Sequence, residues 1–257
     1  ISAMKSVSKK ILLGAAFLAA ASFVQGQFVA QGDDEYIGAK ANVPYWEGKD
    51  VYGDPLVYSL SGWKVDFDNV GDTLNVQVFG SYFDAFMSDP PQTGTQLGDL
   101  FISTNGLSWS TTPETLTDQF GSTSWEYAVQ LGVYSNRQGD LDGVNAGNPL
   151  SGNVVAISDP VYQIKISDEF FVNYPDSPYR KNQEVQLKNI EENDIVSTGV
   201  TWFVDTDLEM ISITIADFSQ IFGAGAAESL GFHWTMSCAN DVVEFAVPEP
   251  STVGMLA

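Results

Sequence analysis

The chain has 257 residues, and its 33 acidic residues against 11 basic ones give a formal net charge of −22 at pH 7. Such a charge excludes DNA, RNA and anionic lipid headgroups as expected partners, because their phosphates would be repelled. The content of 44% hydrophobic and 12% aromatic residues excludes a disordered chain and is sufficient for a sizeable core.

The N-terminal segment has the pattern of a secretory signal peptide, predicted to cover residues 1–26. A basic stretch with three lysines precedes the apolar run Ile11–Val24, whose 14 residues fall short of the roughly 20 that span a bilayer. A short membrane anchor and a buried core helix are the alternatives. The small Gly26 predicts cleavage between Gly26 and Gln27, and the residues before Met4 are interpreted as a start-site remnant. We therefore expect export.

Residues 27–246 are expected to form one all-β domain, a two-sheet antiparallel β-sandwich or jelly roll. Short runs rich in Val, Ile, Tyr, Phe and Trp recur between clusters of Gly, Asn, Asp, Pro and Ser, which is typical of that fold class. The predicted strands are Leu56–Phe67, Thr73–Phe83, Leu97–Ser103, Trp125–Tyr134, Tyr162–Ile166, Glu184–Ile190, Gly199–Val204, Met210–Ile215 and Leu230–Cys238.

Local patterns refine this prediction. Asn69–Asp72 joins two predicted strands with turn-forming residues, which predicts a hairpin. In the second of these strands, Leu74, Val76 and Val78 recur at every second position and are expected to face the core. Asp217–Phe222 is expected to form one helical turn.

The stretch Gly231–Phe245 alternates apolar and polar residues, which predicts a strand with one buried face. Trp234 lies on the predicted buried face and His233 on the opposite one. Cys238, the only cysteine, continues the apolar set and is interpreted as a small buried hydrophobe, with a reactive thiol as the alternative. Pro248 must end the sheet, because proline has no N–H to donate to a ladder.

Beyond the sheet, Val247-Pro248-Glu249-Pro250-Ser251-Thr252 resembles the C-terminal sorting signal of exosortase-dependent (PEP-CTERM) surface proteins. In that family the Pro-Glu-Pro motif is followed by a transmembrane helix and a short basic cluster, and a membrane-embedded exosortase is thought to process the tail. Here only Val253–Ala257 follow, and five residues cannot span a bilayer. The resemblance implies that residues 247–257 are a sorting tail that is cut short or already processed.

Internal segments are similar to arrangements that recur in the same family: Gly98–Gly106 followed by Trp125–Val129, then Tyr179–Gln183, then His233–Asp241. The resemblance implies an exosortase-type processing enzyme as a partner. It also implies a location at the cell surface or in the extracellular matrix of a Gram-negative-type bacterium, with transient membrane contact through the signal and sorting segments. Members of this family mostly lack an assigned biochemistry, so the resemblance informs location and fold more than activity.

The best candidate for a metal site is the glycine-rich loop Gly139–Asn148. Its Asp140, Asp142 and Asn145 side chains carry the hard oxygen ligands that calcium prefers. A standard EF-hand is excluded, because Pro149 stands where the bidentate glutamate belongs. The alternative is an Asx-rich surface turn. No cofactor is required, and calcium is the one that the sequence indicates.

Catalytic groups are sparse in the sequence. Asp66 with Asp68, and Asp205 with Asp207, would each share a strand face, as two hydrolytic carboxyls could. Both pairs lie beside turn residues and are interpreted as solvated. His233, the only histidine, is interpreted as a strand residue, because no Gly-x-Ser-x-Gly elbow supports a catalytic triad. We therefore expect no catalytic residue.

Six tryptophans raise the question of carbohydrate recognition, because an exposed indole can stack on a sugar ring. Most tryptophans of a sandwich are expected in its core. Trp46 and Trp109 stand in loop-like settings and are the candidates for stacking.

Together these features predict a secreted, acidic, non-catalytic structural or adhesive protein. Its expected partners are extracellular polysaccharide or further copies of itself. A carbohydrate-binding module for extracellular polysaccharide is the alternative, and a glycoside-active enzyme is a distant third.

Overall fold

The computed structural model of the chain describes residues 27–33, 51, 54–87, 95–107, 123–131, 149–170, 182–223 and 230–247. Its strands are β1 (Gln27–Asp33), β2 (Gly62–Asp68), β3 (Thr73–Phe79), β4 (Leu100–Ser103), β5 (Tyr127–Gln130), β6 (Leu150–Ala156), β7 (Ile164–Ile166), β8 (Glu184–Leu187), β9 (Ile195–Asp205), β10 (Met210–Ala216), β11 (Gly231–Thr235) and β12 (Val242–Ala246). Its helices are α1 (Pro55–Tyr58), α2 (Ser81–Met87), α3 (Pro160–Gln163), α4 (Ser167–Phe170), α5 (Phe218–Phe222) and the 3-10 turn η1 (Glu192–Asp194). The predicted signal helix lies outside these residues.

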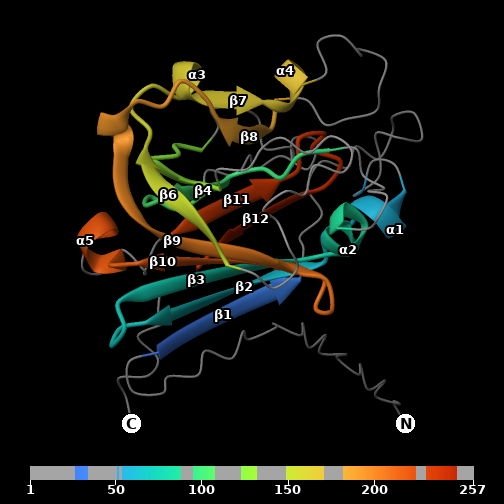
Figure 1. Ribbon diagram of the computed structural model, residues 1–257, viewed down its shortest axis with the longest axis horizontal. Helices are drawn as coiled ribbons and strands as arrows, with labels where there is room; N and C mark the ends of the chain where they lie inside the picture. Colours follow the sequence, from blue (N-terminus) through green and yellow to red (C-terminus); the bar gives the residue numbers. More distant parts are fainter. Residues whose placement is uncertain are drawn as a thin grey trace, which may run out of the picture.

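Ten of the described strands form one antiparallel sheet in the order β1-β2-β3-β10-β9-β6-β5-β4-β11-β12. The other two, β7 and β8, pair with each other in a separate antiparallel ladder. Figure 1 shows that the large sheet curls, with β1 at its lower edge and the β7–β8 ladder at the top. The prediction of an antiparallel β-fold is confirmed in the form of a large curled sheet.

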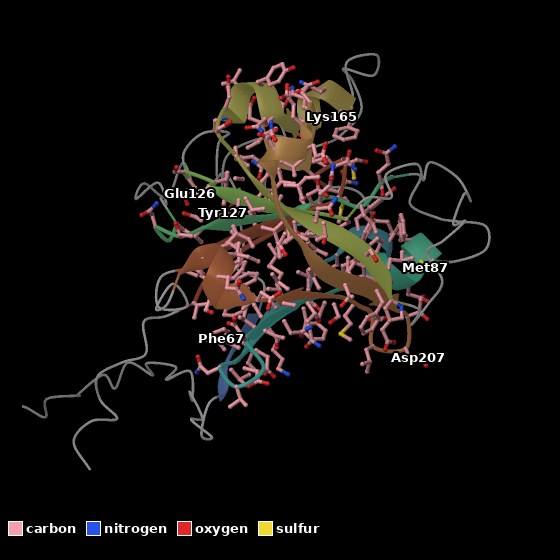
Figure 2. The ribbon with its side chains drawn as sticks, turned by 60° about the vertical axis from the view of Figure 1, so that its left-hand side comes forward. Phe67, Met87, Glu126, Tyr127, Lys165 and Asp207 are labelled. Atoms are coloured by element: carbon pink, nitrogen blue, oxygen red, sulfur yellow. The ribbon has the colours of Figure 1, made fainter. Side chains whose placement is uncertain are left out.

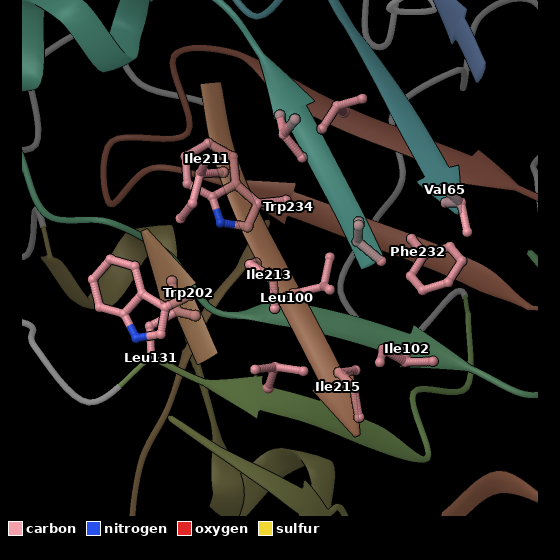
Figure 3. Packing of buried hydrophobic residues seen from close by; sticks show 14 of the residues in the cluster. Val65, Leu100, Ile102, Leu131, Trp202, Ile211, Ile213, Ile215, Phe232 and Trp234 are labelled. Carbon is pink, nitrogen blue, oxygen red and sulfur yellow. The ribbon is translucent and has the colours of Figure 1, made fainter. Parts of the chain in front are cut away.

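The main core fills the inside of this curl. Figure 3 shows Ile213 of β10, Leu100 of β4 and Trp234 of β11 converging there, although their strands lie apart in the sheet order. β2 also contacts β12, the strand at the far end of the sheet order. There the ring of Trp63 stacks on that of Phe245, with 4.2 Å between centroids and 3° between planes.

A second, smaller core lies on the outer face of β4, β5 and β6, beneath the β7–β8 ladder. Phe101, Ala128 and Val155 alternate along these strands with residues of the main core, and Trp125, Ile164 of β7 and Leu187 of β8 complete the cluster. Figure 2 shows Lys165 of β7 in this outer layer and Phe67 of β2 toward the other end of the molecule. The outer layer explains why β4 and β11 are buried on both faces.

Aspartates shape two hairpin turns of the large sheet. Asp68 Oδ1 accepts a hydrogen bond from the backbone N–H of Val70 at 2.9 Å, and Asp205 Oδ1 accepts one from Leu208 at 3.0 Å. Asp72 has a φ of 48°, which lies in the left-handed region that Asp tolerates better than most residues. The predicted hairpin between β2 and β3 is confirmed.

Each of the nine predicted strand runs overlaps an observed strand, and the predicted helical turn is α5. Three of these runs also include helix, and one of them, Tyr162–Ile166, begins in α3. Leu56–Phe67 begins in α1, because Pro55 stands at the first helical position and Asp54 accepts the N–H of Leu56 at 3.0 Å as its cap. Thr73–Phe83 ends in α2.

The predicted strand Leu230–Cys238 contains β11, and after a turn the end of the stretch Gly231–Phe245 forms most of β12, which the alternation does not predict. The residues between the two strands include Cys238 and also Ala239, which has a φ of 44°. The prediction of one buried face is wrong, because all five residues of β11 are buried. The outer face of β11 packs against β8, a strand that is distant in the sequence.

The sequence pattern does not predict β1, β6 or β12. In β6, Gly152 interrupts the apolar pattern, and glycine weakens a strand in isolation. A Cβ at this position would lie 2.7 Å from the carbonyl oxygen of Gln130 and 3.2 Å from Val200 Cγ1. The close approach of neighbouring strands therefore requires glycine at this position.

Candidate functional site

The polar groups best suited to chemistry gather between β11, β12 and β8. His233 of β11 points away from the main core, as its place in the alternation predicts, and is 0% exposed. Glu244 of β12 and Glu184 of β8 lie beside it and are also buried. Together with the aromatic residues Phe101 and Trp125, these three residues are called the His233 cluster.

Both ring nitrogens of His233 bond to protein atoms. Nδ1 lies 2.6 Å from Glu244 Oε1, and Nε2 lies 2.7 Å from the backbone carbonyl oxygen of Glu184. A carbonyl oxygen can only accept, so Nε2 carries a proton and donates it. The proton between Nδ1 and Glu244 is shared, giving either an imidazolium with a carboxylate or a neutral imidazole with a carboxylic acid. The pair is neutral in both forms, which lowers the cost of burying it.

Aromatic rings enclose the imidazole. The ring centroids of Phe101 and Trp125 lie 5.9 and 5.7 Å from that of His233. Trp125 Nε1 donates to Glu184 Oε1 at 3.2 Å, which ties the cluster to β8. A general base needs a ring nitrogen that can reach a substrate, whereas both nitrogens of His233 are engaged inside the fold. The geometry therefore fits a polar contact that joins β8, β11 and β12.

A buried carboxylate nearby holds β8 against the large sheet. Asp99, which precedes β4, accepts the backbone N–H of Leu131 at 3.0 Å through Oδ1 and that of Leu187 at 2.7 Å through Oδ2. Its own N–H donates to the carbonyl oxygen of Val185 at 2.7 Å. Hydrogen bonds from backbone N–H groups stabilise a carboxylate that is removed from water, so Asp99 acts as a structural link.

Asp241 has a similar structural role in the turn between β11 and β12. It accepts the N–H of Leu60 at 2.7 Å and that of Val242 at 2.9 Å, and its carbonyl oxygen accepts from Thr235 Oγ1 at 2.5 Å. The bond to Leu60 joins positions 181 residues apart in sequence. It fixes the C-terminal hairpin to the segment that leads into β2.

Sequence reasoning missed the four buried acids Asp99, Glu184, Asp241 and Glu244. One signal was present for Glu244, because it interrupts the apolar run Val242–Phe245, where a charge needs a partner if both faces are covered. The sequence does not show which faces are covered.

The predicted calcium ligands Asp140, Asp142 and Asn145 lie outside the described residues, and so do the predicted stacking residues Trp46 and Trp109. These predictions stay open. Within the described segments, no group of three or more His, Cys, Asp or Glu side chains is placed to hold a metal ion.

Gly26 and the Pro248-Glu249-Pro250 motif also lie outside the described residues. Gln27 is the first residue of β1. Val247, the first residue of the predicted sorting signal, is buried, and its N–H donates to the carbonyl oxygen of Leu230 at 2.9 Å.

The turns that carry the two candidate acid pairs lie at opposite ends of the paired strands β3 and β10. The register of these strands runs from Met210 opposite Phe79 at one end to Ala216 opposite Thr73 at the other. One acid of each pair, Asp68 or Asp205, caps its turn as described above. Asp66 Oδ2 lies 4.0 Å from Lys64 Nζ in a partly exposed pair. This arrangement favours the interpretation of both pairs as solvated turn acids.

Cys238 is buried in the main core, which confirms its interpretation as a small hydrophobe. Burial raises the pKa of its thiol from 9.0 to about 12. Burial also raises the pKa of Tyr82, whose hydroxyl lies 2.9 Å from Thr95 Oγ1, well above its usual value. Of the described tryptophans, Trp125, Trp202 and Trp234 are buried in the two cores.

Among the helices of the described segments, none has the length and apolar character needed to cross a membrane.

Comparison of the chain with protein-family models, with curated proteins and with solved structures finds no match.

Proposed function

We propose that this chain is a secreted, acidic, non-catalytic structural or adhesive protein of a bacterial cell surface or extracellular matrix, sorted by an exosortase-type enzyme. One observation supports the non-catalytic part of the proposal: His233, Glu244 and Glu184 are buried inside the fold and bond to its own strands. The secretion and sorting parts rest on the N-terminal signal pattern and the Pro248-Glu249-Pro250 motif. The net charge of −22 favours solubility in a hydrated matrix. For the finer architecture, we propose a two-sheet sandwich or jelly roll to which the curled sheet contributes both layers, preceded by a signal helix.

Co-sedimentation with extracellular polysaccharide from the producing cell tests this role. The whole chain is incubated with the polysaccharide in calcium or in EDTA, and the supernatant is assayed for new reducing ends. We expect sedimentation with the polysaccharide, or self-association without it, and no new reducing ends. New reducing ends would contradict the non-catalytic role.

Matched variants separate adhesion from sugar recognition. Saturable binding that Trp46→Ala or Trp109→Ala abolishes would favour the carbohydrate-binding alternative. Tyr162→Ala is the control, because Tyr162 is an aromatic residue exposed on α3. Equal binding by all three variants would favour the structural role.

The sorting role has its own test in the full-length precursor. Replacing Pro248, Glu249 and Pro250 by alanine is expected to prevent processing and surface delivery. Replacement of Ser251 and Thr252 is the control. Unchanged processing and location of the first variant would contradict exosortase-type sorting.

A further inference from the structure

The strand β1 is the less firmly packed of the two strands that end the large sheet. It pairs with β2 in continuous register along all seven of its residues. Among its residues with described surroundings, Ala30 is buried, and Gln31 is exposed. In β12, at the other end, four of five residues are buried, and Phe245 stacks on Trp63. Of the four residues of β1 with described surroundings, Ala30 alone belongs to the main core, so their attachment depends mainly on the backbone ladder with β2.

The length of chain beside β1 is sufficient for it to reach a second molecule. Residues 34–50, which number 17, separate β1 from Val51, a residue buried at 8% exposure. Seventeen residues span at most about 60 Å when extended. A globular chain of about 230 residues has a radius of gyration of about 17 Å, hence a diameter of about 45 Å. The link can therefore exceed the width of the molecule.

We propose that β1 exchanges between copies of this chain, so that β1 of one copy pairs with β2 of a second copy in the register it has with its own β2. The same ladder forms in both cases, so the contact energy is nearly unchanged and protein concentration governs the balance. The partner of the β2 edge is therefore a second copy of this chain. This inference deepens the proposed structural role by identifying how copies of the chain join. It rests on that role for its biological purpose.

A paired-cysteine variant tests the exchange directly. Gln31→Cys/Lys64→Cys places two thiols at opposed positions on the outer face of the β1–β2 ladder, at a spacing that suits a disulfide. The whole chain is passed through mild urea at low and high protein concentration, returned to buffer and oxidised. Peptide mapping and non-reducing electrophoresis then show whether positions 31 and 64 are joined within one chain or between chains. We expect the inter-chain fraction to rise about tenfold for each tenfold rise in concentration while dimers are scarce.

The variant Thr201→Cys/Thr214→Cys is the matched control, because these positions oppose each other on central strands β9 and β10. Its bond should form within one chain at every concentration. Native mass spectrometry of mixed light and heavy unmodified chains gives a second readout, in which mixed dimers are expected. A 31–64 bond that is confined to single chains at all concentrations would overturn the exchange. The result is independent of the polysaccharide experiment, so failure of either proposal can be recognised separately.

Discussion

At the scale of single residues, the fold depends on ionisable side chains that are buried with partners. His233 shares a proton with Glu244, while Asp99 and Asp241 each accept two backbone N–H groups. Apart from the local bond between Asp241 and Val242, these contacts join different strands or segments of the chain. Removal of one partner leaves the other buried without its bond, which is more costly than removal of both.

This asymmetry predicts coupling between His233 and Glu244. We expect His233→Leu and Glu244→Leu each to lower the free energy of unfolding by about 3 kcal/mol. The double variant should lose clearly less free energy of unfolding than the sum of the two single losses, because no member of the pair then stays buried without its partner. Urea unfolding of the four proteins measures the coupling energy.

The ion pair of Glu169 and Lys188 is the control for that cycle. Its Oε1 and Nζ atoms are 2.7 Å apart, close to the 2.6 Å between Glu244 Oε1 and His233 Nδ1, but the two side chains are 40% and 27% exposed. Alanine variants of this pair should show a coupling of less than about 1 kcal/mol. Equal coupling in the two cycles would mean that burial does not strengthen the His233 contact.

Cys238 predicts a loss of stability in alkali. Its pKa is raised by burial from 9.0 to about 12, so between these pH values the unfolded chain releases the thiol proton and the native chain keeps it. The free energy of unfolding should therefore fall as pH rises from 9, by at most about 1.4 kcal/mol per pH unit from this group. Urea unfolding at several pH values should show a shallower fall for Cys238→Ala.

Tyr82 serves as the internal reference in that experiment. Its pKa is raised mainly by burial, with Cys238 as a smaller cause, so Tyr82 contributes alkaline sensitivity to both proteins and the difference between the two pH curves reports chiefly the thiol. Superimposable slopes above pH 9 would show that the thiol does not remain protonated in the native state.

At the scale of elements, the docking of β8 on the outer face of the large sheet converts a half-buried sheet into one buried on both faces. Asp99 and the His233 cluster supply the polar contacts of this docking. Gly98 supplies the space, because a Cβ there would lie 2.0 Å from the carbonyl oxygen of Thr235 and 2.9 Å from that of Val185. Backbone atoms on both sides cannot move without displacing β11 or β8.

Two glycines therefore differ in their tolerance of alanine. Gly98→Ala is expected to lower the free energy of unfolding by about 3 kcal/mol or more, because it forces two strands apart. Gly199→Ala should change it by less than about 1 kcal/mol, because its nearest neighbours are Ser197 Oγ at 3.3 Å and Ala216 Cβ at 3.4 Å. Thermal and urea unfolding compare the two, and similar losses would contradict close strand packing at Gly98.

At the scale of the whole molecule, the net charge of −22 acts against the compact state. Salt screens repulsion between charges over about 8 Å at physiological ionic strength. Sodium chloride should therefore raise the melting temperature, with no specific site involved.

Calcium should act beyond this screening if the Gly139–Asn148 loop binds it. We expect calcium chloride to raise the melting temperature above sodium chloride at equal ionic strength. Asp140→Asn/Asp142→Asn should remove this excess. The exposed acids Asp84 and Asp207 are outside the Gly139–Asn148 stretch in the sequence. The control variant Asp84→Asn/Asp207→Asn should therefore retain the excess rise in melting temperature. Identical melting curves in the two salts would contradict a calcium site.

Much of the local structure could be predicted from the sequence, because its causes act over a few residues. The alternation of Leu74, Val76 and Val78 predicts their common inward face, and the turn residues at 69–72 predict the hairpin between β2 and β3. Cys238 continues the apolar alternation and is buried as predicted, although it lies in the turn after β11 rather than on the strand. In each case the side-chain period or the turn chemistry determines the local geometry.

The candidate site could not be predicted in this way, because its residues come from strands that meet only after folding. Glu184 lies 49 positions from His233 in the sequence, and Leu60 lies 181 positions from Asp241. Gly152 weakens the apolar pattern of β6, and only the neighbouring backbones show why glycine is required there. The sequence by itself determined the antiparallel β class, several turns and the inward faces of strands. Only the tertiary structure decided which outward faces are covered, because that depends on the curl of the sheet and the docking of β8.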